Sequence, residues 1–209
     1  MTMKERALIV IDVQNEYFDG PLAIHYPSRE QSLAHIIEAV EAAQDRLPTV
    51  IVQHENPKNA AAFAAGSQGQ RLHPALKACS SSSWHWVTKQ YASIFAGTTL
   101  TDWLRTQDVK VVTLVGYMSN NCVIATAADA ERLGFAVEVL SDATGSIHLA
   151  NEAGAISARQ IHETLMVLLQ SNFAAVATTK DWLRTIQSGN LLPKSNLVVS
   201  ALQGNAAYP

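Results

Sequence analysis

Three residues spread along the chain could together activate a sulfur nucleophile, and the first of them is Cys122. It ends the segment 116–122, in which a strongly apolar stretch passes into a helical pattern within a few residues. At the start of a helix, unpaired backbone N–H groups and the helix dipole favour a thiolate and can receive a developing oxyanion. The alternative is that Cys122 only packs the helix start, because free cysteines are commonly buried.

Asp12 and Lys89 are the two residues that could assist such a nucleophile. Asp12 ends an otherwise uncharged apolar stretch, where an ionised carboxylate is costly unless it has a partner. It could take the thiol proton as a general base, or it could cap a neighbouring helix. Lys89 is flanked by aromatic residues and could hold the carboxylate and lower the pKa of the thiol. An ordinary solvated surface lysine is the alternative.

The elements that must position these residues follow from hydrophobic periodicity. Short β-branched runs predict buried strands, and apolar residues at helical spacing predict helices. The predicted strands are 7–13, 49–53, 110–116, 136–140 and 174–178, and the predicted helices are 28–46, 100–107, 121–133 and 150–170. This alternation favours a three-layer αβα domain with an open, mostly parallel sheet. Ligands gather beyond the carboxyl ends of such strands, where Asp12 and the segment 117–122 fall. The long irregular stretch 55–86 is typical of a functional loop.

Composition limits the class of partner. The 209 residues are 48% hydrophobic and 16% charged, which fits one domain over 1–186 followed by an apolar arm over 187–209. A net charge of -3 without basic clusters argues against nucleic acid and against an anionic membrane surface. We find no membrane span and no signal peptide pattern, so the expected location is cytoplasmic. The two cysteines, Cys79 and Cys122, are expected to be reduced.

The arm predicts association. Its leucines and valines follow the last periodic helix, so we expect it to pack on the domain or on a neighbouring subunit. Symmetric assembly is common among soluble proteins, and a homo-oligomer, either a dimer or a tetramer, is the expectation.

Three segments carry a family resemblance. ALIVIDVQNEYF (7–18), TKQYASIF (88–95) and VGYMSNNCVIATAADAERLGFAVEVLSDA (115–143) resemble the isochorismatase-like cysteine hydrolases in order and spacing, over most of 7–183. The resemblance implies an open six-stranded parallel sheet and an Asp, Lys, Cys triad that cleaves C–N bonds, placed on Asp12, Lys89 and Cys122. It also implies an oxyanion hole from the N–H groups of Met118 and Cys122, with a cis peptide bond between Tyr117 and Met118.

Two departures from the family pattern bear on the chemistry. Ser119 and Asn120 stand where many relatives carry a Thr-Asp pair. The nicotinamidase metal motif, an Asp-x-His followed later by a second His, is missing, and the chain has Gln-His-Glu-Asn at 53–56 instead. His54 and His85 lack the ligand spacing of a zinc site, so we expect neither a metal nor another cofactor.

The substrate class follows from the triad that the resemblance implies. An intact triad favours hydrolysis of an amide, carbamoyl or ureido bond in a small molecule through a thioester. Polar and aromatic residues near the three motifs are the expected substrate contacts: Gln14, Phe18, His54, Trp84, Tyr91 and Tyr117. Three alternatives stay open, namely an isochorismatase-type ether hydrolase, a non-catalytic ligand-binding protein on the same fold, and a redox-active thiol protein.

Overall fold

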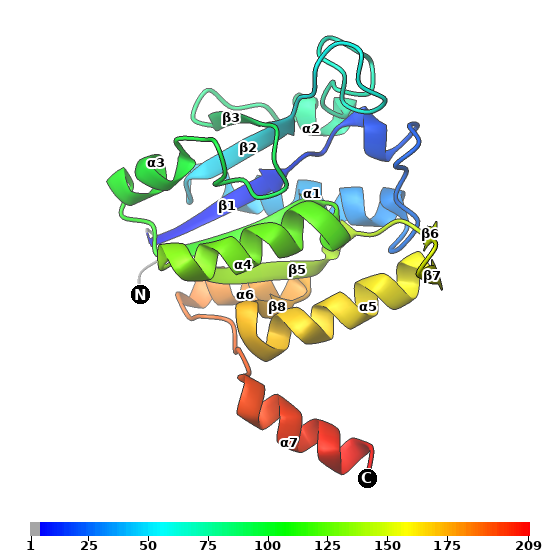
Figure 1. Cartoon of the computed structure of the whole chain (residues 1–209). Coiled ribbons are helices and arrows are strands. Elements are labelled where there is room, and N and C mark those ends of the chain that lie inside the picture. Colours follow the sequence, from blue (N-terminus) through cyan, green and yellow to red (C-terminus); the bar gives the residue numbers. More distant parts are fainter. Residues whose placement is uncertain (1–4) are drawn as a thin grey trace.

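A six-stranded sheet between two layers of helices forms the body of the protein (Figure 1). The computed structural model describes residues 5–209. In spatial order the strands are β3 (His85–Lys89), β2 (Thr49–His54), β1 (Arg6–Ile11), β4 (Val111–Tyr117), β5 (Ala136–Gly145) and β8 (Ala175–Ala177). Every adjacent pair is parallel. The predicted three-layer fold is therefore confirmed, with a sheet that is parallel throughout.

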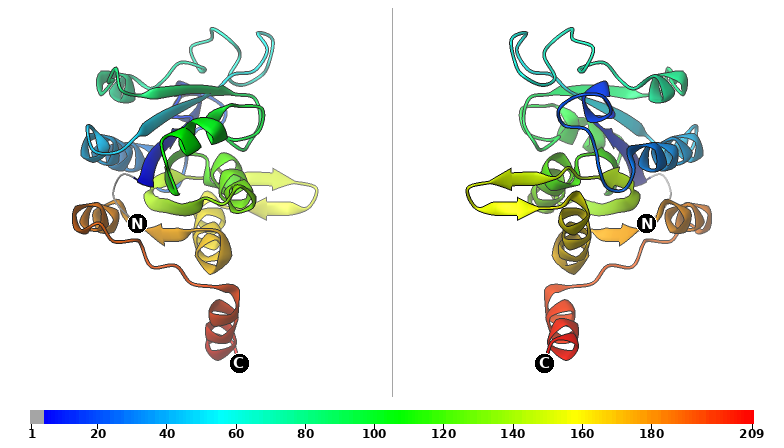
Figure 2. Two further views of the ribbon diagram at one scale, coloured as in Figure 1. Left: turned by 90° about the vertical axis from the view of Figure 1, so that its left-hand side faces the viewer. Right: turned by 90° about the vertical axis from the view of Figure 1, so that its right-hand side faces the viewer.

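Helices bury both faces of this sheet. α1 (Arg29–Ala43) and α6 (Thr179–Ser188) cover one face, and α3 (Leu100–Thr106), α4 (Ile124–Leu133) and α5 (Ala158–Leu168) cover the other (Figures 1 and 2). All six residues of β1 are buried, which explains why residues 7–11 form a continuous apolar run rather than an alternating one. The short α2 (Pro74–Ala78) lies in the long connection between β2 and β3.

The strand order places the chemistry-bearing residues at one edge of the sheet. The order reverses between β1 and β4, which makes this the crevice where α/β sheets bind ligands. Asp12 directly follows β1, and Lys89 is the last residue of β3. Cys122 follows β4 in the π-helical turn η3 (Ser119–Val123), which leads into α4.

Two stretches differ from the sequence prediction. β3 begins at His85, inside the stretch that was expected to be irregular. The predicted helix over 150–170 begins only at Ala158, because β6 (Leu149–Asn151) and β7 (Gly154–Ile156) form an antiparallel hairpin. Gly154 at φ +139° gives a backbone that residues with side chains rarely adopt, and Ser157 with Gln160 forms a capping box that starts α5. The prediction that a helix already includes residues 150–156 was therefore wrong.

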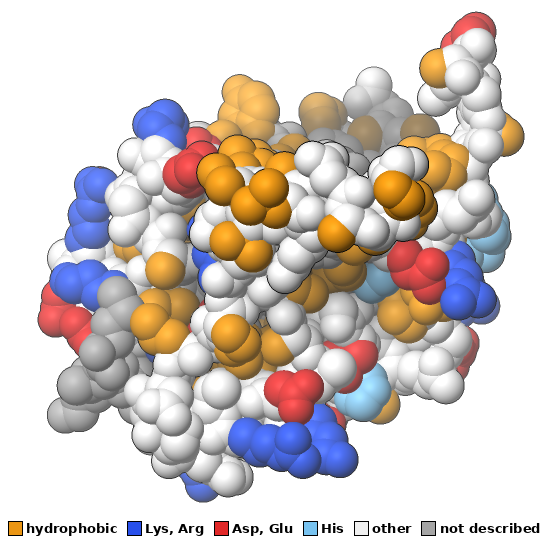
Figure 3. All heavy atoms as spheres, turned by 90° about the horizontal axis from the view of Figure 1, so that it is seen from below, with side chains coloured by type: hydrophobic (Ala, Val, Ile, Leu, Met, Phe, Trp, Pro, Cys, Tyr) orange, Lys and Arg blue, Asp and Glu red, His pale blue; other side chains and the backbone are white. Residues whose placement is uncertain are grey.

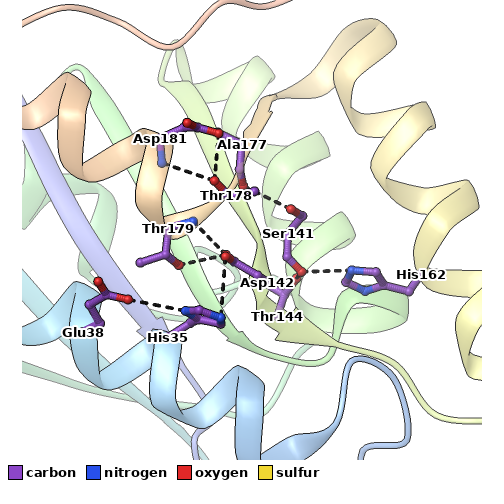
Figure 4. A network of polar contacts seen from close by, with 10 residues as sticks. All are labelled: His35, Glu38, Ser141, Asp142, Thr144, His162, Ala177, Thr178, Thr179 and Asp181. Atoms are coloured by element: carbon purple, nitrogen blue, oxygen red, sulfur yellow. Dashed lines mark hydrogen bonds and ion pairs between the residues drawn. The ribbon is translucent and has the colours of Figure 1, made fainter.

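Buried polar contacts tie the layers together. Arg6 and Glu138 form an ion pair of 2.7 Å whose side chains are 3% exposed, and Thr113 Oγ1 donates to the same carboxylate at 2.7 Å. Asp142 Oδ1 accepts from both the backbone N–H and the hydroxyl of Thr179 at 2.8 Å, which fastens the start of α6 to β5 (Figure 4). The buried charges of Arg6 and Glu138 thus have hydrogen-bonding partners, as a folded interior requires.

The C-terminal arm leaves the body. After α6 the chain runs as a linker to α7 (Leu197–Ala207), which stands off from the other helices (Figures 1 and 2). No residue of α7 is buried. Within residues 5–209, no helix combines the length and the apolar character needed to cross a bilayer.

Candidate active site

The three residues singled out from the sequence meet in space. Lys89 Nζ lies 2.6 Å from Asp12 Oδ2 and 3.3 Å from Cys122 Sγ. The Asp12 and Lys89 side chains are fully buried, and Cys122 is 2% exposed. The alternatives for the residues taken singly were that Cys122 only packs the helix start, that Asp12 caps a helix and that Lys89 is a solvated surface residue. The contact of all three side chains argues against these alternatives, because the fold buries a thiol directly beside an ion pair.

Backbone conformation helps to aim the carboxylate. Asp12 has φ +50°, in the left-handed region that residues other than glycine visit seldom. Its N–H donates to Val52 O at 2.9 Å, and its carbonyl accepts from the N–H of Gln14 at 2.7 Å, so the turn is held from both sides. Unfavourable backbone conformations of this kind persist where the surroundings enforce them, and they concentrate at functional sites.

Lys89 has more acceptors than protons. Besides Asp12 and Cys122, its ammonium group contacts His54 Nδ1 at 3.0 Å and the Tyr91 carbonyl at 3.2 Å. An ammonium group donates only three hydrogen bonds. The thiol sulfur is intrinsically the weakest acceptor of the four, so its contact with Lys89 is the one most easily given up. The thiol proton is not used in this contact and can point toward Asp12.

The electrostatics of the site favour a protonated thiol at rest. Burial, and then the charge of Asp12, raise the pKa of Cys122 to about 12, although Lys89 acts in the opposite direction. The expectation of a lowered thiol pKa is therefore not supported, because desolvation outweighs the nearby cation. Burial also raises the pKa of Asp12 above its usual value, and Lys89 opposes this rise. The pKa of Lys89 is raised by Asp12 and Cys122 against the effect of burial.

His54 is held as a neutral acceptor. Its Nε2 lies 3.1 Å from Asn56 Oδ1, which accepts and so places the ring proton on Nε2, while Nδ1 accepts from Lys89. Burial and the Lys89 charge lower the pKa of His54. Both ring nitrogens are therefore engaged, and a metal ion at Nδ1 would compete directly with a buried ammonium group.

The residues present do not fit the metal site of the nicotinamidases. Glu55 accepts from Gln70 Nε2 at 3.4 Å, and His85 stacks on Trp103 with ring centroids 4.0 Å apart. No cluster of three His, Cys, Asp or Glu side chains suited to a metal ion occurs within residues 5–209. We therefore derive no chemical step through a metal.

The loop before Cys122 has the backbone that the resemblance implies. The peptide bond between Tyr117 and Met118 is cis. Gly116 precedes it at φ +100°, and a Cβ atom there would lie 2.1 Å from Ile11 O, so only glycine fits between β1 and β4. In the described part of the chain, the Met118 N–H has no hydrogen-bond acceptor. It is therefore available to a substrate oxygen, beside the first turn that carries Cys122.

A buried histidine holds the other side of this loop. Ser119 Oγ lies 3.0 Å from His162 Nδ1, and His162 Nε2 lies 3.0 Å from the Ser141 carbonyl. The carbonyl can only accept, so Nε2 carries the proton and Ser119 donates to Nδ1. Figure 4 shows His162 reaching from α5 toward Ser141 on β5. Ser119 already stood out in the sequence as a departure from the family pattern, but no local sequence signal pointed to His162.

The expected substrate contacts fall into two groups. His54 lies against Lys89, Phe18 lies beside Tyr117 with ring centroids 5.7 Å apart, and the Tyr91 ring is 61% exposed. Gln14, in contrast, uses both ends of its amide on the backbone of His54, donating at 2.9 Å and accepting at 2.8 Å. We therefore assign Gln14 to positioning His54.

Two of the aromatic side chains point away from the thiol. The Tyr117 hydroxyl is bonded to Ser32 Oγ of α1 at 2.8 Å, so its polar end faces the opposite side of the sheet. Trp84 precedes β3, whereas Lys89 ends it. At about 3.3 Å per residue the strand places Trp84 roughly 16 Å from the reactive edge. Trp84 therefore lies at the opposite end of β3 from Lys89, and its contact with substrate stays a prediction.

Tyr17, which precedes Phe18 after the Asp12 strand, also lies in the site. It is 2% exposed, and its ring packs between Phe63 and Tyr117 with centroid distances of 5.2 and 5.5 Å. Burial, followed by the charges of Cys122 and Asp12, raises the pKa of its hydroxyl. The sequence signal was its position five residues after Asp12, in the 3-10 turn η2 (Asn15–Tyr17), whose burial could not be read locally.

Residues 6–181 match the family model described as the isochorismatase domain. The chain belongs to the isochorismatase family. An isochorismatase family protein of Bacillus subtilis is 29% identical over 85% of this chain and 98% of its own length. The nicotinamidase of Escherichia coli is 24% identical over 70% of this chain and 86% of its own length.

Solved isochorismatase-family structures agree in fold. A crystal structure from Burkholderia xenovorans is 44% identical and superposes with a TM-score of 0.95 over 99% of both chains. An isochorismatase of Pseudomonas putida is 27% identical, with a TM-score of 0.80 over 87% of this chain and 91% of its own. The expected family membership is thus confirmed, and the chain is an isochorismatase-family hydrolase.

Proposed function

We propose that this protein is a cysteine hydrolase that cleaves the C–N bond of a small amide, carbamoyl or ureido compound through a thioester. The observation that carries the proposal is the buried cluster in which Lys89 Nζ lies 2.6 Å from Asp12 and 3.3 Å from Cys122. Further support comes from two similar proteins, the nicotinamidase of Escherichia coli and the maleamate amidohydrolase of Pseudomonas putida, which is 30% identical over 48% of this chain.

In the proposed first half-reaction, Asp12 accepts the proton of the Cys122 thiol as the sulfur attacks the substrate carbonyl. The carbonyl oxygen becomes an oxyanion that accepts from the N–H groups of Met118 and Cys122. Asp12 then gives its proton to the leaving nitrogen, the C–N bond breaks and a thioester remains. Lys89 keeps the buried carboxylate compensated throughout.

In the second half-reaction, water replaces the amine. Asp12 takes a proton from the water as its oxygen attacks the thioester carbonyl, and the same N–H groups hold the oxyanion. The C–S bond then breaks, the sulfur regains the proton, and a carboxylic or carbamic acid leaves. Because Cys122 is 2% exposed and Tyr17 beside it is equally buried, the substrate is expected to be small.

The test is a release assay over small amides, carbamoyl compounds and ureides, with ammonia and acid as readouts. Intact-protein mass spectrometry after rapid acid quenching should detect an acyl adduct on Cys122. Cys79→Ala is the matched control, because Cys79 is the other thiol and lies at the end of α2. Its activity should equal that of the wild type. An adduct confined to Cys79, cleavage of vinyl ethers alone, or sulfenic acid formation without any hydrolysis would contradict the proposal.

Ser119→Ala is expected to lower kcat about 10-fold while KM changes less than about twofold. The substitution removes the hydrogen bond to His162 and so loosens the loop that carries the Met118 N–H, and small misplacements near reacting atoms are costly. Steady-state kinetics on the substrate found above would measure both constants. Ser141→Ala is the control, since it retains the backbone carbonyl that His162 uses. Equal losses in the two variants would remove the special role of the Ser119 contact.

The pH dependence of kcat/KM should report Asp12 as the base. Asp12 must be ionised to accept the thiol proton, and its pKa is raised by burial. Activity should therefore fall as the pH drops through a value above that of an ordinary carboxylate near 3.9. No rising limb near the usual thiol pKa of about 8.5 is expected, because the thiol is deprotonated only during attack. A limb at that position would indicate a free thiolate mechanism instead.

A further inference from the structure

We infer that α7 is an exchanged arm that docks on a second copy of this chain, and that each copy receives the other's arm near the end of α5. The large apolar residues of α7 are exposed to solvent. The exposed fractions of Leu197, Val198, Val199 and Leu202 are 59%, 69%, 42% and 65%. They lie on several sides of the helix, and helices that are apolar all round are normally buried.

The stand-off position of α7 is built into the linker. Arg6, deep in the body, donates to the Asn190 carbonyl at 3.0 Å, Leu192 is 7% exposed, and Gln170 donates to the Pro193 carbonyl at 3.2 Å. Asn196 then caps α7 by accepting from the Val199 N–H at 2.9 Å. The linker is thus fastened to its own body up to Pro193, and the helix is started in a direction that leads away from it.

One side of α7 has a partner within its own chain. Among the described helices and strands, α7 lies closest to η4 (Leu169–Phe173), which directly follows α5. An isolated helix of this length is marginally stable in water, so a standing helix needs tertiary contacts on its apolar surface. The remaining exposed sides therefore require a surface supplied from outside the chain.

The body of the protein offers a matching surface. Near the end of α5, Val167 is 73% exposed and Leu168 is 40% exposed, and Leu191 of the linker is 49% exposed. Residues 164–179 contain no Asp, Glu, Lys or Arg, and neither do residues 195–209. Seen from below, hydrophobic side chains gather over α7, and most Lys and Arg side chains lie toward the edges of this face (Figure 3). Two uncharged surfaces of one chain are thus complementary in polarity.

The area favours a second copy over a different partner. An 11-residue helix is about 16 Å long and about 10 Å across, so its outward half presents on the order of 250 Å². A single arm docked on an unrelated protein would bury roughly 500 Å² in total, which is less than specific interfaces need. Reciprocal exchange involves two arms and two receiving surfaces, so it buries about 1,000 Å² of accessible surface in total. Specific interfaces begin at about this size.

The arm is also shared with a related chain. The Burkholderia xenovorans structure covers 99% of this chain, which includes α7, whereas the Pseudomonas putida isochorismatase covers 87%. An arm helix with a counterpart in a second, 44% identical structure is a reproducible part of this fold.

The test is the mass of the full chain in solution, measured by light scattering after size exclusion over a range of concentrations. We expect twice the chain mass of 22.6 kDa, or an even multiple of it. Leu202→Lys and Leu197→Lys should each shift the mass to one chain or halve the assembly. Gln203→Lys is the matched control, because it adds the same charge to the same helix at an exposed polar position. It should leave the mass unchanged.

A substitution on the receiving surface completes the test. Val167→Glu should dissociate the assembly as the arm variants do. Far-UV circular dichroism would verify folding, which should persist because no residue of α7 is buried and Val167 is largely exposed. A monomeric wild type, or an assembly that survives both arm variants, would overturn the inference. Dissociation by the arm variants together with full assembly of Val167→Glu would overturn the proposed receiving surface.

Discussion

Cys122→Ser is expected to lower kcat/KM by about 10⁴-fold or more while leaving the fold intact. Loss of a nucleophile in comparable triads removes nearly all of the catalysis beyond that of binding and the oxyanion hole. The hydroxyl is smaller than the thiol and far less acidic, so Asp12 cannot deprotonate it effectively. The measurement is the rate of amine or ammonia release on a substrate cleaved by the wild type, together with the melting temperature.

The melting temperature separates the chemical loss from a structural one. Cys122 accepts a side-chain hydrogen bond from Lys89, which a serine can still accept, and a serine hydroxyl can also still donate to Asp12. The free energy of unfolding should therefore change by less than about 1.5 kcal/mol. Substantial residual turnover in this variant, with no acyl adduct in the wild type, would show that another residue attacks the substrate.

Lys89→Met is expected to abolish activity and to lower the free energy of unfolding by about 3–5 kcal/mol at neutral pH. Methionine fills a similar volume, but Asp12 is then a fully buried carboxylate without its cation, and an uncompensated buried charge is strongly destabilising. Urea denaturation at several pH values would measure the loss. Without Lys89 the folded pKa of Asp12 lies still further above its unfolded value of about 3.9. The protein should thus regain stability below that value and lose it as the pH rises through the folded pKa.

The double variant Asp12→Asn with Lys89→Met provides the control for this interpretation. It removes both charges, so most of the stability lost in Lys89→Met should return, while turnover stays absent. Asp12→Asn alone leaves Lys89 buried without its carboxylate and should also be destabilised. Additive losses in the double variant would mean that the two side chains do not act as a pair.

The fold was readable from the sequence because it rests on local patterns. Residues 7–11 of β1 are all apolar since helices cover both faces of the sheet, and this burial leaves a continuous run in the sequence. The hairpin of β6 and β7 was missed for the opposite reason. Its residues are exposed, so burial imposes no period on them, and Ile156 could be assigned equally well to a helix.

The sequence by itself singled out the residues that we propose carry the chemistry. Asp12, Lys89 and Cys122 stand at the ends of patterned segments, and a charge or thiol at such a point is conspicuous against apolar neighbours. The topology of a parallel sheet then brings strand ends to one edge, which is why residues 33 positions apart can lie within 3.3 Å.

Only the tertiary structure decided the state of these groups and the identity of their supporting neighbours. The position of Cys122 at a helix start predicted a lowered thiol pKa. Its deep burial raises the thiol pKa instead, and burial is a property of the whole fold. The packing of Tyr17, the hydrogen bond of His162 to Ser119 and the two hydrogen bonds of the Gln14 amide to His54 all join segments that are distant in the sequence. Such contacts leave no local pattern. The direction of α7 depends on hydrogen bonds from Arg6 and Gln170 to the linker, and so could not be read from the apolar residues of the arm alone.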